Sequence, residues 1–345
     1  MSRKYNVAVV GATGAVGEEF YRLFEEYNFP INKLVPLASK NSVGKEIEYN
    51  KKFIKVKELT EDVFEEEEIE IAFFSAGGSV SAKFAKYAVE AGAVVIDNTS
   101  HFRMDPDIPL VVPEVNPEDI KAWKERGIIA NPNCSTIQMV QALKALDNLY
   151  GIKRVDVSTY QATSGAGKAG MEELVKQMQD FFAFKLDESE HKAFMHQIAL
   201  NVIPQVDVPM ENGYTKEEMK MVNETRKILH KDIEVSATCV RVPVLRSHSE
   251  AITVTFGEDV DVNLALVRDA FENFENLVVQ DDLKESVYPM PVTATDTDYT
   301  YVGRIRKDIY RPNILHFWNV ADQVRVGAAT NALRIAKKWI ELEEV

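Results

Sequence analysis

The first 130 residues of the chain alternate short apolar runs with longer amphipathic ones. A short apolar run bounded by turn residues is typical of a buried strand, and apolar residues that recur every three or four positions indicate a helix. Strands that alternate with helices form βαβ units and a mostly parallel sheet. We predict strands at Tyr5–Val10, Leu34–Ser39, Ile69–Ser75 and Ala93–Asn98, and helices at Ala15–Tyr27 and Ser81–Ala91.

After about residue 130 the expected strands become longer, which indicates an α+β arrangement. The final segment, Val324–Leu342, has the apolar period of an amphipathic helix, and we expect it to pack on the first domain. The expected fold class is therefore α/β: a Rossmann-type dinucleotide-binding domain of residues 1–132, completed by residues 324–345, and an α+β domain of residues 133–323. The expected elements of the second domain are strands at Val155–Ala162, Val235–Val244 and Ala251–Phe256, and helices at Met171–Phe182, Lys216–Leu229 and Asn263–Phe274.

The charge and the cysteine content narrow the classes of function. The 345-residue chain has a formal net charge of −14, and an acidic chain repels phosphate backbones, so nucleic-acid binding is not expected. No apolar run approaches the length of a membrane span, and no secretory signal opens the sequence. Two distant cysteines favour a reducing, cytoplasmic setting. His191 and His196 do not have the i,i+4 spacing of a metal-binding helix face, so no metal site is expected.

A glycine-rich turn joins the first predicted strand to the first predicted helix. Gly11, Gly14 and Gly17 permit a tight turn and bring backbone N–H groups to a helix N-terminus, where a pyrophosphate binds. NAD-binding domains usually place a carboxylate at the end of the second strand to hold the ribose 2′-hydroxyl. The segment Leu37–Ser42 has no carboxylate but carries two hydroxyls and a lysine, which favours NADP.

Cys134 follows the segment Asn131–Asn133 and begins a predicted helix. The positive end of the helix dipole favours the thiolate, which is the nucleophilic form of cysteine. The alternative is a buried, unreactive thiol, and we interpret Cys239, which lies inside a predicted strand, in that way. A thiolate nucleophile needs a proton partner, and the residues by themselves leave His248 and His316 as rivals for that position.

Two motifs resemble those of the bacterial aspartate-β-semialdehyde dehydrogenases. They are the glycine turn Gly11–Gly17 and the segment Asn131–Thr136, and the resemblance extends over almost the whole chain. So many matches in the same order make a chance resemblance negligible. The further matching stretches are Phe74–Gly78, Asp97–Ser100, Phe102–Asp105, Val112–Asn116, Tyr160–Gly167, Arg241–Val244 and His248–Glu250.

The resemblance implies a reaction and assigns the catalytic residues. Members of the family reduce L-aspartyl-4-phosphate to L-aspartate 4-semialdehyde with NADPH and release phosphate, on the route to lysine and diaminopimelate, methionine, threonine and isoleucine. By this resemblance Cys134 is the nucleophile, and His248 rather than His316 is the general acid and base. Asn133 would help to hold the phosphate or the developing oxyanion, and Gln161 would orient the substrate or the attacking thiol.

The resemblance also implies the substrate contacts. Arg241 would bind the α-carboxylate as a planar fork, Arg103 and Lys220 would bind the phosphate, and Glu217 would bind the ammonium group. Glu217 and Lys220 also have the spacing of an ordinary exposed i,i+3 pair. An arginine in an apolar strand, as expected for Arg103 and Arg241, needs a partner.

NADP contacts and a homo-oligomer, either a dimer or a tetramer, follow from the same resemblance. The second domain is expected to carry both catalysis and dimerisation, and an insertion such as Ser164–Pro209 is a candidate interface. Two positions depart from the family: Asn41 stands where many relatives have arginine, and Gln323 replaces the asparagine of a late Asp-Asn pair. The expected cofactor-binding residues are Gly11, Thr13, Gly14, Ala15, Val16, Ser39, Lys40, Ser42, Ser75, Ala76, Gly77, Ser164, Gly165 and Gln323.

Two other functions are alternatives. An N-acetyl-γ-glutamyl-phosphate reductase has the same fold and thiol chemistry, but its substrate has no free ammonium group for Glu217, and its Gly-Cys-Tyr context is absent around Cys134. A non-catalytic dinucleotide-binding protein needs only the first domain. It leaves Cys134, His248 and the two arginines Arg103 and Arg241 without a function.

Overall fold

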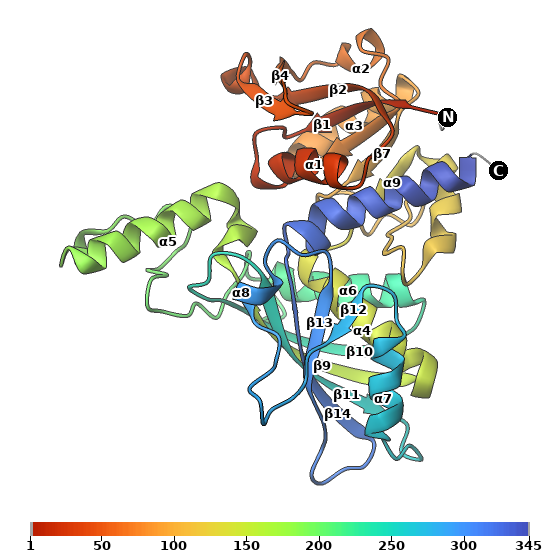
Figure 1. Ribbon diagram of the computed structural model, residues 1–345, viewed down its shortest axis with the longest axis vertical. Coiled ribbons are helices and arrows are strands. Elements are labelled where there is room, and N and C mark those ends of the chain that lie inside the picture. Colours follow the sequence, from red (N-terminus) through yellow and green to blue (C-terminus); the bar gives the residue numbers. More distant parts are fainter. Residues whose placement is uncertain (1–2, 344–345) are drawn as a thin grey trace. The chain divides into compact units, whose positions relative to one another are not determined.

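The computed structural model describes residues 3–343, which form two compact units (Figure 1). The first unit contains the described residues up to 133 and from 328 onward, and the second contains residues 134–327. The expected limits of 132 and 324 therefore differ from these bounds by one and four residues. No helix in the described part of the chain is long and apolar enough to cross a membrane.

The first unit is built on a parallel sheet of six strands in the order β5-β2-β1-β6-β7-β8. Helices cover both faces of the sheet, and for this reason its central strands read as continuous apolar runs. The strands are β1 (Tyr5–Val10), β2 (Ile31–Ala38), β5 (Lys57–Glu58), β6 (Ile71–Phe74), β7 (Val94–Asp97) and β8 (Ile128–Ala130), with a separate hairpin of β3 (Glu46–Tyr49) and β4 (Lys52–Lys55). The helices are α1 (Ala15–Glu26), α2 (Val63–Glu66), α3 (Gly78–Glu90) and α9 (Thr330–Glu343).

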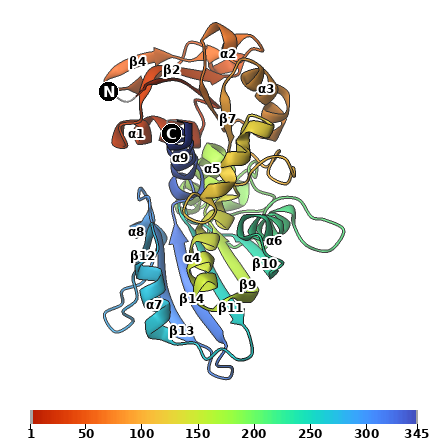
Figure 2. The ribbon, with the colours of Figure 1, turned by 90° about the vertical axis from the view of Figure 1, so that its right-hand side faces the viewer.

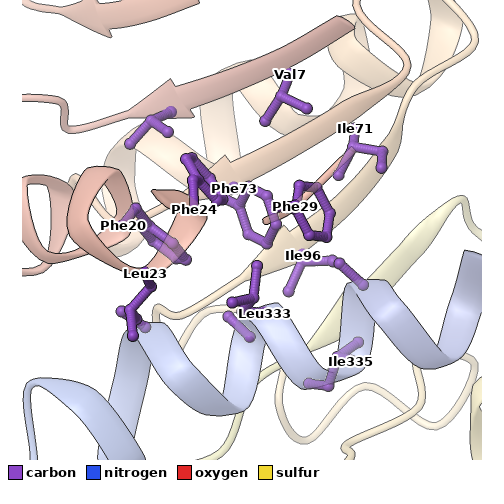
Figure 3. Close-up of a cluster of buried hydrophobic side chains, with 14 of the residues drawn as sticks. Val7, Phe20, Leu23, Phe24, Phe29, Ile71, Phe73, Ile96, Leu333 and Ile335 are labelled. Atoms are coloured by element: carbon purple, nitrogen blue, oxygen red, sulfur yellow. The ribbon is translucent and has the colours of Figure 1, made fainter. Parts of the chain in front are cut away.

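The main core of this unit lies between one face of the sheet and the helices α1 and α9 (Figure 3). Phe20 of α1 packs against Phe73 of β6 with 4.7 Å between the ring centroids, and Leu333 of α9 joins the same cluster. On the opposite face, Phe64 of α2 stacks on Phe74, the neighbour of Phe73 in β6. Each such side chain, when fully buried, contributes about 1.5–3 kcal/mol. The C-terminal helix is thus part of the first unit, as its amphipathic pattern predicted.

The second unit has a mixed sheet of six strands in the order β10-β9-β11-β14-β13-β12. Inward and outward residues alternate along its strands, so one face packs on helices and the other is more exposed. Helix α4 lies along the inner face and contacts β9, β11, β13 and β14 (Figure 2). The strands are β9 (Ile152–Gln161), β10 (Glu234–Arg241), β11 (His248–Phe256), β12 (Leu277–Val279), β13 (Thr300–Lys307) and β14 (Ile314–Ala321). The helices are α4 (Cys134–Tyr150), α5 (Gly167–Phe182), α6 (Lys216–Leu229), α7 (Leu264–Glu272) and α8 (Pro291–Ala294).

Several elements differ from the sequence-based expectation. Strand β10 ends at Arg241 rather than at Val244, and β11 begins at His248 rather than at Ala251. The expected C-terminal helix begins at Thr330 rather than at residue 324, because a π-helical turn over Arg325–Ala329 precedes it. Strands β13 and β14 were not predicted. Charged residues occupy the outward positions of β13, and the register shifts between Gly303 and Arg306, so the alternation of apolar residues is broken. The hairpin of β3 and β4 was also missed, since both strands are short and polar.

Candidate active site

Cys134 is the first residue of α4 and is partly exposed. Its thiol forms no disulfide. The backbone of Gly327 approaches it closely, because a Cβ built on Gly327 would lie 2.6 Å from the Cβ of Cys134. Cys134 also lies within electrostatic range of Arg241: burial lowers the pKa of the guanidinium, and the charge of Glu217 and then that of a thiolate at Cys134 oppose this. The second unit therefore holds a helix-terminal thiol beside a buried cation, as a nucleophilic thiolate requires.

His248 begins β11 and is fully buried. Its Nδ1 accepts a hydrogen bond of 3.0 Å from the backbone N–H of Ala162. Burial, and then the positive charge of Arg241, hold the pKa of His248 well below 6.5, so the ring is neutral at physiological pH. An Nδ1 that accepts leaves the proton of a neutral imidazole on Nε2, and Nε2 has no hydrogen-bond partner within the described residues.

Three neighbouring strands each place one polar residue next to Ala162, the backbone partner of His248. Gln161 ends β9, Arg241 ends β10 and His248 begins β11, which runs antiparallel to β9. Nη1 of Arg241 donates to the carbonyl oxygen of Ala162 at 2.7 Å. A Cβ on Gly165 would lie 2.6 Å from that same Nη1 and 3.3 Å from Nε2 of His248, so only glycine leaves this space open. Arg241 and His248 are thus held side by side by one short stretch of backbone.

Glu217 and Lys220 belong to the first turns of α6, which begins with a capping box at Thr215. Glu217 accepts hydrogen bonds from Gln161 Nε2 at 3.2 Å and from Lys220 Nζ at 3.0 Å. Burial opposes the charge of Lys220, but Glu217 and Asp207 outweigh it and raise its pKa. The reading of Glu217 and Lys220 as an ordinary exposed pair is wrong, since Glu217 is only 5% exposed.

Asp207 was not among the candidate residues. It holds Lys220 Nζ at 2.7 Å from a loop where its own φ is +68°. No local pattern identifies this residue, because its contact depends on how the loop before α6 folds back.

The first unit carries the glycine turn. Gly11 has a φ of +91°, and a Cβ there would lie 2.6 Å from the carbonyl oxygen of Ser75, so glycine allows the turn after β1 to approach the end of β6. Gly14 caps α1 without any side-chain hydrogen bond. The first N–H groups of α1 are thus left for an anionic ligand, and the turn fits a pyrophosphate.

Other expected cofactor residues of the first unit lie at the carboxyl ends of the same parallel strands, where ligands of such sheets bind. After β2, the segment Lys40–Ser42 forms a 3-10 turn, and Ser42 Oγ lies 3.4 Å from Thr13 Oγ1 of the glycine turn. After β6, Gly77 has a φ of +95° and precedes α3. Ser39 and Lys40 are exposed, as the binding of a 2′-phosphate would require.

Arg103 lies in a turn after β7 and not in a strand, so that part of the expectation is wrong. It is nevertheless only 7% exposed, and its Nη2 donates to the carbonyl oxygen of Asn98 at 2.7 Å. The loop between them is held by buried Asp97, which accepts hydrogen bonds from Ser81 and from Thr99. Asn133, the last residue of this unit before the chain enters the second unit, is also buried.

The remaining expected cofactor residues belong to the second unit. Ser164 lies in the 3-10 turn after β9, and Gly165 follows it beside Arg241. The amide of Gln323 donates to Ser164 Oγ and accepts from the backbone N–H of Ser247 at 2.8 Å. Gln323 therefore ties together two loops of this unit, and its role toward a cofactor stays a prediction.

His316, the rival of His248, does not belong to this group. It lies on β14 opposite Thr253, five residues along β11 from His248. Its ring nitrogens contact Asp308 Oδ2 at 3.0 Å and Thr253 Oγ1 at 2.8 Å. The described residues contain no group of three or more His, Cys, Asp or Glu side chains that could hold a metal ion.

Family models match both halves of the chain. Residues 6–123 match the model described as "Semialdehyde dehydrogenase, NAD binding domain", and residues 143–326 match "Semialdehyde dehydrogenase, dimerisation domain". Together these two models cover most of the sequence, and the family resemblance of the motifs is confirmed. The expected fold class, a dinucleotide-binding domain followed by a second domain of mixed α and β structure, is confirmed as well.

Individual proteins agree with the family models. The chain is 66% identical to an aspartate-semialdehyde dehydrogenase of Campylobacter jejuni over 99% of both sequences, and 51% identical to one of Helicobacter pylori over 98% of this chain and 99% of the other. Among solved structures, aspartate semialdehyde dehydrogenase II of Vibrio cholerae, complexed with ASA, has a TM-score of 0.94 at 48% identity over 99% of both chains. An aspartate semialdehyde dehydrogenase of Candida albicans with NADP has a TM-score of 0.75 at 26% identity, over 98% of this chain and 99% of the other.

Proposed function

Because the chain belongs to the semialdehyde dehydrogenase family, we propose that it reduces L-aspartyl-4-phosphate to L-aspartate 4-semialdehyde with NADPH, through a thioester on Cys134. The reaction would serve the biosynthesis of lysine, diaminopimelate, methionine, threonine and isoleucine in the cytoplasm. One observation carries the proposal: the helix-terminal thiol of Cys134, the neutral ring of His248 and the buried guanidinium of Arg241 lie together in one unit.

The covalent step begins at Cys134. Its thiolate attacks the acyl carbon of the phosphorylated substrate, a C–S bond forms, and the C–O bond to phosphate breaks as phosphate leaves. When bound, the nicotinamide cofactor supplies the hydride that reduces the thioester carbon. The proton on Nε2 of His248 then stabilises the resulting oxyanion by a hydrogen bond. Breaking of the C–S bond releases the aldehyde and restores the thiolate.

The polar residues of the second unit suit a substrate with charges at both ends. The guanidinium of Arg241 binds the α-carboxylate with the donors that Ala162 does not use. Glu217 binds the ammonium group. This role gives a reason for its burial beside the amide of Gln161 and the ammonium of Lys220. By the family resemblance, Lys220 and Arg103 are the proposed phosphate ligands, and Asn133 and Gln161 are proposed to orient the reacting groups.

NADP is the proposed cofactor of the first unit. The glycine turn fits its pyrophosphate, and Ser39, Lys40 and Ser42 follow β2 without a carboxylate that would repel a 2′-phosphate. A structural relative in Candida albicans is described with NADP, which supports the same cofactor here. The other proposed contacts are those of the expected set, Gly11, Gly14, Ala15, Val16, Thr13, Ser75, Ala76, Gly77, Ser164, Gly165 and Gln323.

Two copies of the chain form the proposed assembly. On the sheet face opposite α4, Tyr160 is 39% exposed and its ring lies 5.4 Å from that of Trp318. Beside Trp318 is a hollow of about 310 Å³ whose lining includes Pro289 and Met290. The lining also includes Arg304 and Arg306. Aromatic residues, methionine and arginine gathered in one place are typical of a surface that a partner covers. The family description of this domain as a dimerisation domain supports a second copy as that partner.

The proposal is tested by a coupled assay with L-aspartate 4-semialdehyde, phosphate and NADP, run on the wild type and on two cysteine variants. Cys134→Ala is expected to lose activity by at least about 1000-fold, because no nucleophile remains to form the thioester. Cys239→Ala is the matched control and should retain most activity, since burial raises the pKa of that thiol and keeps it protonated. A Cys134→Ala enzyme that still reduces NADP at a similar rate would show that the covalent mechanism is wrong.

A further inference from the structure

Beneath the catalytic side chains of the second unit lies a layer of buried polar residues. Moving two residues along each strand from Gln161 and His248 leads to Thr159 on β9 and Glu250 on β11, and both are fully buried. Thr159 and Asn319 of β14 stand directly opposite Glu250 on its two sides. The next inward positions, such as Ile252, are apolar. One polar layer therefore separates the site from the hydrophobic core.

Helix α4 contributes Gln138 to this layer, one turn after Cys134 on the same helix. Its Nε2 donates to Asn319 Oδ1 at 2.7 Å and lies 3.4 Å from the carbonyl oxygen of His248. In return, Nδ2 of Asn319 donates to the backbone carbonyl of Gln138 at 3.1 Å. These bonds join the turn of the helix that follows Cys134 to the strand residue His248 itself.

Glu250 stands at the centre of this network, and none of the residues from 3 to 343 forms an ion pair with it. Its side chain is 0% exposed, and the amides of Gln138 and Asn319 are the side chains that lower its pKa, whereas burial raises it well above 4.5. As a carboxylate it would accept no hydrogen bond of normal geometry from the described residues, and Gln138 Oε1 likewise has no donor. A proton on Glu250 provides one donor in a place where acceptors are in excess.

We propose that Glu250 is a positioning residue: with Gln138 and Asn319 it fixes the N-terminal turn of α4, which carries Cys134, against the start of β11, which carries His248. This inference rests on the proposed function, because the relative position of the thiol and the imidazole matters only if the two groups act in the same reaction. A buried polar network is costly unless every member is satisfied, and an apolar residue at position 250 would be the simpler core. The network instead connects two segments 110 residues apart through side-chain bonds.

The test uses four variants of the full chain: Glu250→Gln, Glu250→Leu, Gln138→Leu and, as a control of matched burial, Ile252→Val. Two quantities are measured for each variant. The first is kcat and KM with aspartate semialdehyde. The second is the rate at which iodoacetamide alkylates Cys134 without substrate between pH 5 and 9, followed by mass spectrometry of the peptide that contains it. Alkylation reports the thiolate directly, so it tests the positioning even if turnover follows a different chemistry.

We expect Glu250→Gln to keep kcat within about threefold and to leave the alkylation profile unchanged, because an amide also supplies a donor. Glu250→Leu and Gln138→Leu should lower kcat by roughly 10- to 100-fold with KM nearly constant, as a displacement of about 1 Å does. Their alkylation profiles should shift along the pH axis, whereas that of Ile252→Val should not.

A purely structural layer gives a different result. Each variant is then measured at the same number of degrees below its own Tm. If the two leucine variants have the same alkylation profile as Ile252→Val and a similar kcat, the proposal is overturned. If Glu250→Leu does not fold, Gln138→Leu decides the question by the same two measurements. A failure of the proposed function is seen separately, as activity that survives in Cys134→Ala.

Discussion

Ala162 makes two backbone hydrogen bonds to neighbouring side chains: its N–H donates to His248 Nδ1 at 3.0 Å, and its carbonyl oxygen accepts from Arg241 Nη1 at 2.7 Å. A backbone N–H can only donate, so the tautomer of His248 is decided without reference to any hydrogen position. The same peptide segment directs the charge of Arg241 toward the ring. Ala162 thus presents His248 as a neutral donor at Nε2.

For His248, ¹⁵N NMR of histidine-labelled enzyme should show an unprotonated Nδ1 and no titration near pH 6.5. The physical reason is that burial and Arg241 lower the pKa of the ring, so protonation requires a pH well below 6.5. His248→Asn should lower kcat by about 100- to 1000-fold, the usual cost of losing one donor to a developing oxyanion. His316→Asn is the matched control and should remain close to wild type. A ring that titrates at 6.5 or above would contradict the tautomer and its cause.

For Arg241, replacement by lysine should lower kcat/KM for aspartate semialdehyde by about 10- to 100-fold, the cost of losing one or two charge-assisted hydrogen bonds. A lysine has a point charge and cannot donate to the carbonyl of Ala162 while presenting a planar fork to a carboxylate. Arg268, an arginine of α7 that pairs with Asp281, provides the control. Steady-state kinetics of Arg241→Lys and Arg268→Lys are compared. An unchanged kcat/KM in Arg241→Lys excludes the carboxylate role.

For the cofactor, the wild type should use NADP with a kcat/KM at least about tenfold above that for NAD, equivalent to roughly 1.4 kcal/mol. Lys40→Ala should remove most of this preference and leave the value for NAD unchanged, because only a 2′-phosphate needs the charge. Lys51→Ala, which removes a lysine from the turn between β3 and β4, is the control. Equal use of both cofactors by the wild type would count against Ser39, Lys40 and Ser42 as phosphate ligands.

For Glu250, the free energy of unfolding should depend on pH in a way that Glu250→Gln abolishes. The folded pKa is raised, so between 4.5 and that higher value the folded state holds a proton that the unfolded chain releases. Stability from this group is therefore complete below 4.5 and is lost as pH rises. Glu250→Gln leaves unchanged Cys239, whose pKa the charge of Glu250 raises, and His248, which lies two residues before Glu250 on β11.

Urea unfolding at pH 5 and pH 8 measures this effect. Glu250→Gln should gain stability relative to the wild type as the pH rises, and a difference that is the same at both pH values would show that Glu250 is not held in its protonated form. Ile252→Val, expected to cost about 0.5–1.5 kcal/mol at either pH, is the control.

For the assembly, Trp318→Asp should convert a dimer into single chains in sedimentation velocity, because a carboxylate cannot be buried without a partner on an aromatic surface. Phe53→Asp places the same charge on an exposed position of the first unit, where the wild-type side chain is 69% exposed, and should leave the dimer intact. A dimer that persists in Trp318→Asp would place the interface elsewhere, with the segment 164–209 as the next candidate.

Much of this protein follows from local sequence. The apolar runs and the glycine turn are local patterns, and they predicted β1, α1, β6, α3 and β7 to within a few residues. Cys134 was predicted at a helix start because it follows the segment Asn131–Asn133, where the preceding strand ends. Helix α4 does begin at Cys134. The amphipathic period of the last helix likewise predicted that α9 completes the first unit.

Tertiary structure decided the rest, because it depends on residues far apart in the chain. Apart from the family resemblance, the residues left His248 and His316 as rivals, and the register of β11 with its neighbours places one beside Arg241 and the other beside Asp308. Asp207 meets Lys220 only because a loop folds back. Glu250 lay outside the strand expected at Ala251–Phe256, and only the longer β11 gives it an inward, buried position. Its partners Gln138 and Asn319 come from a helix and a strand that only the tertiary structure brings to it.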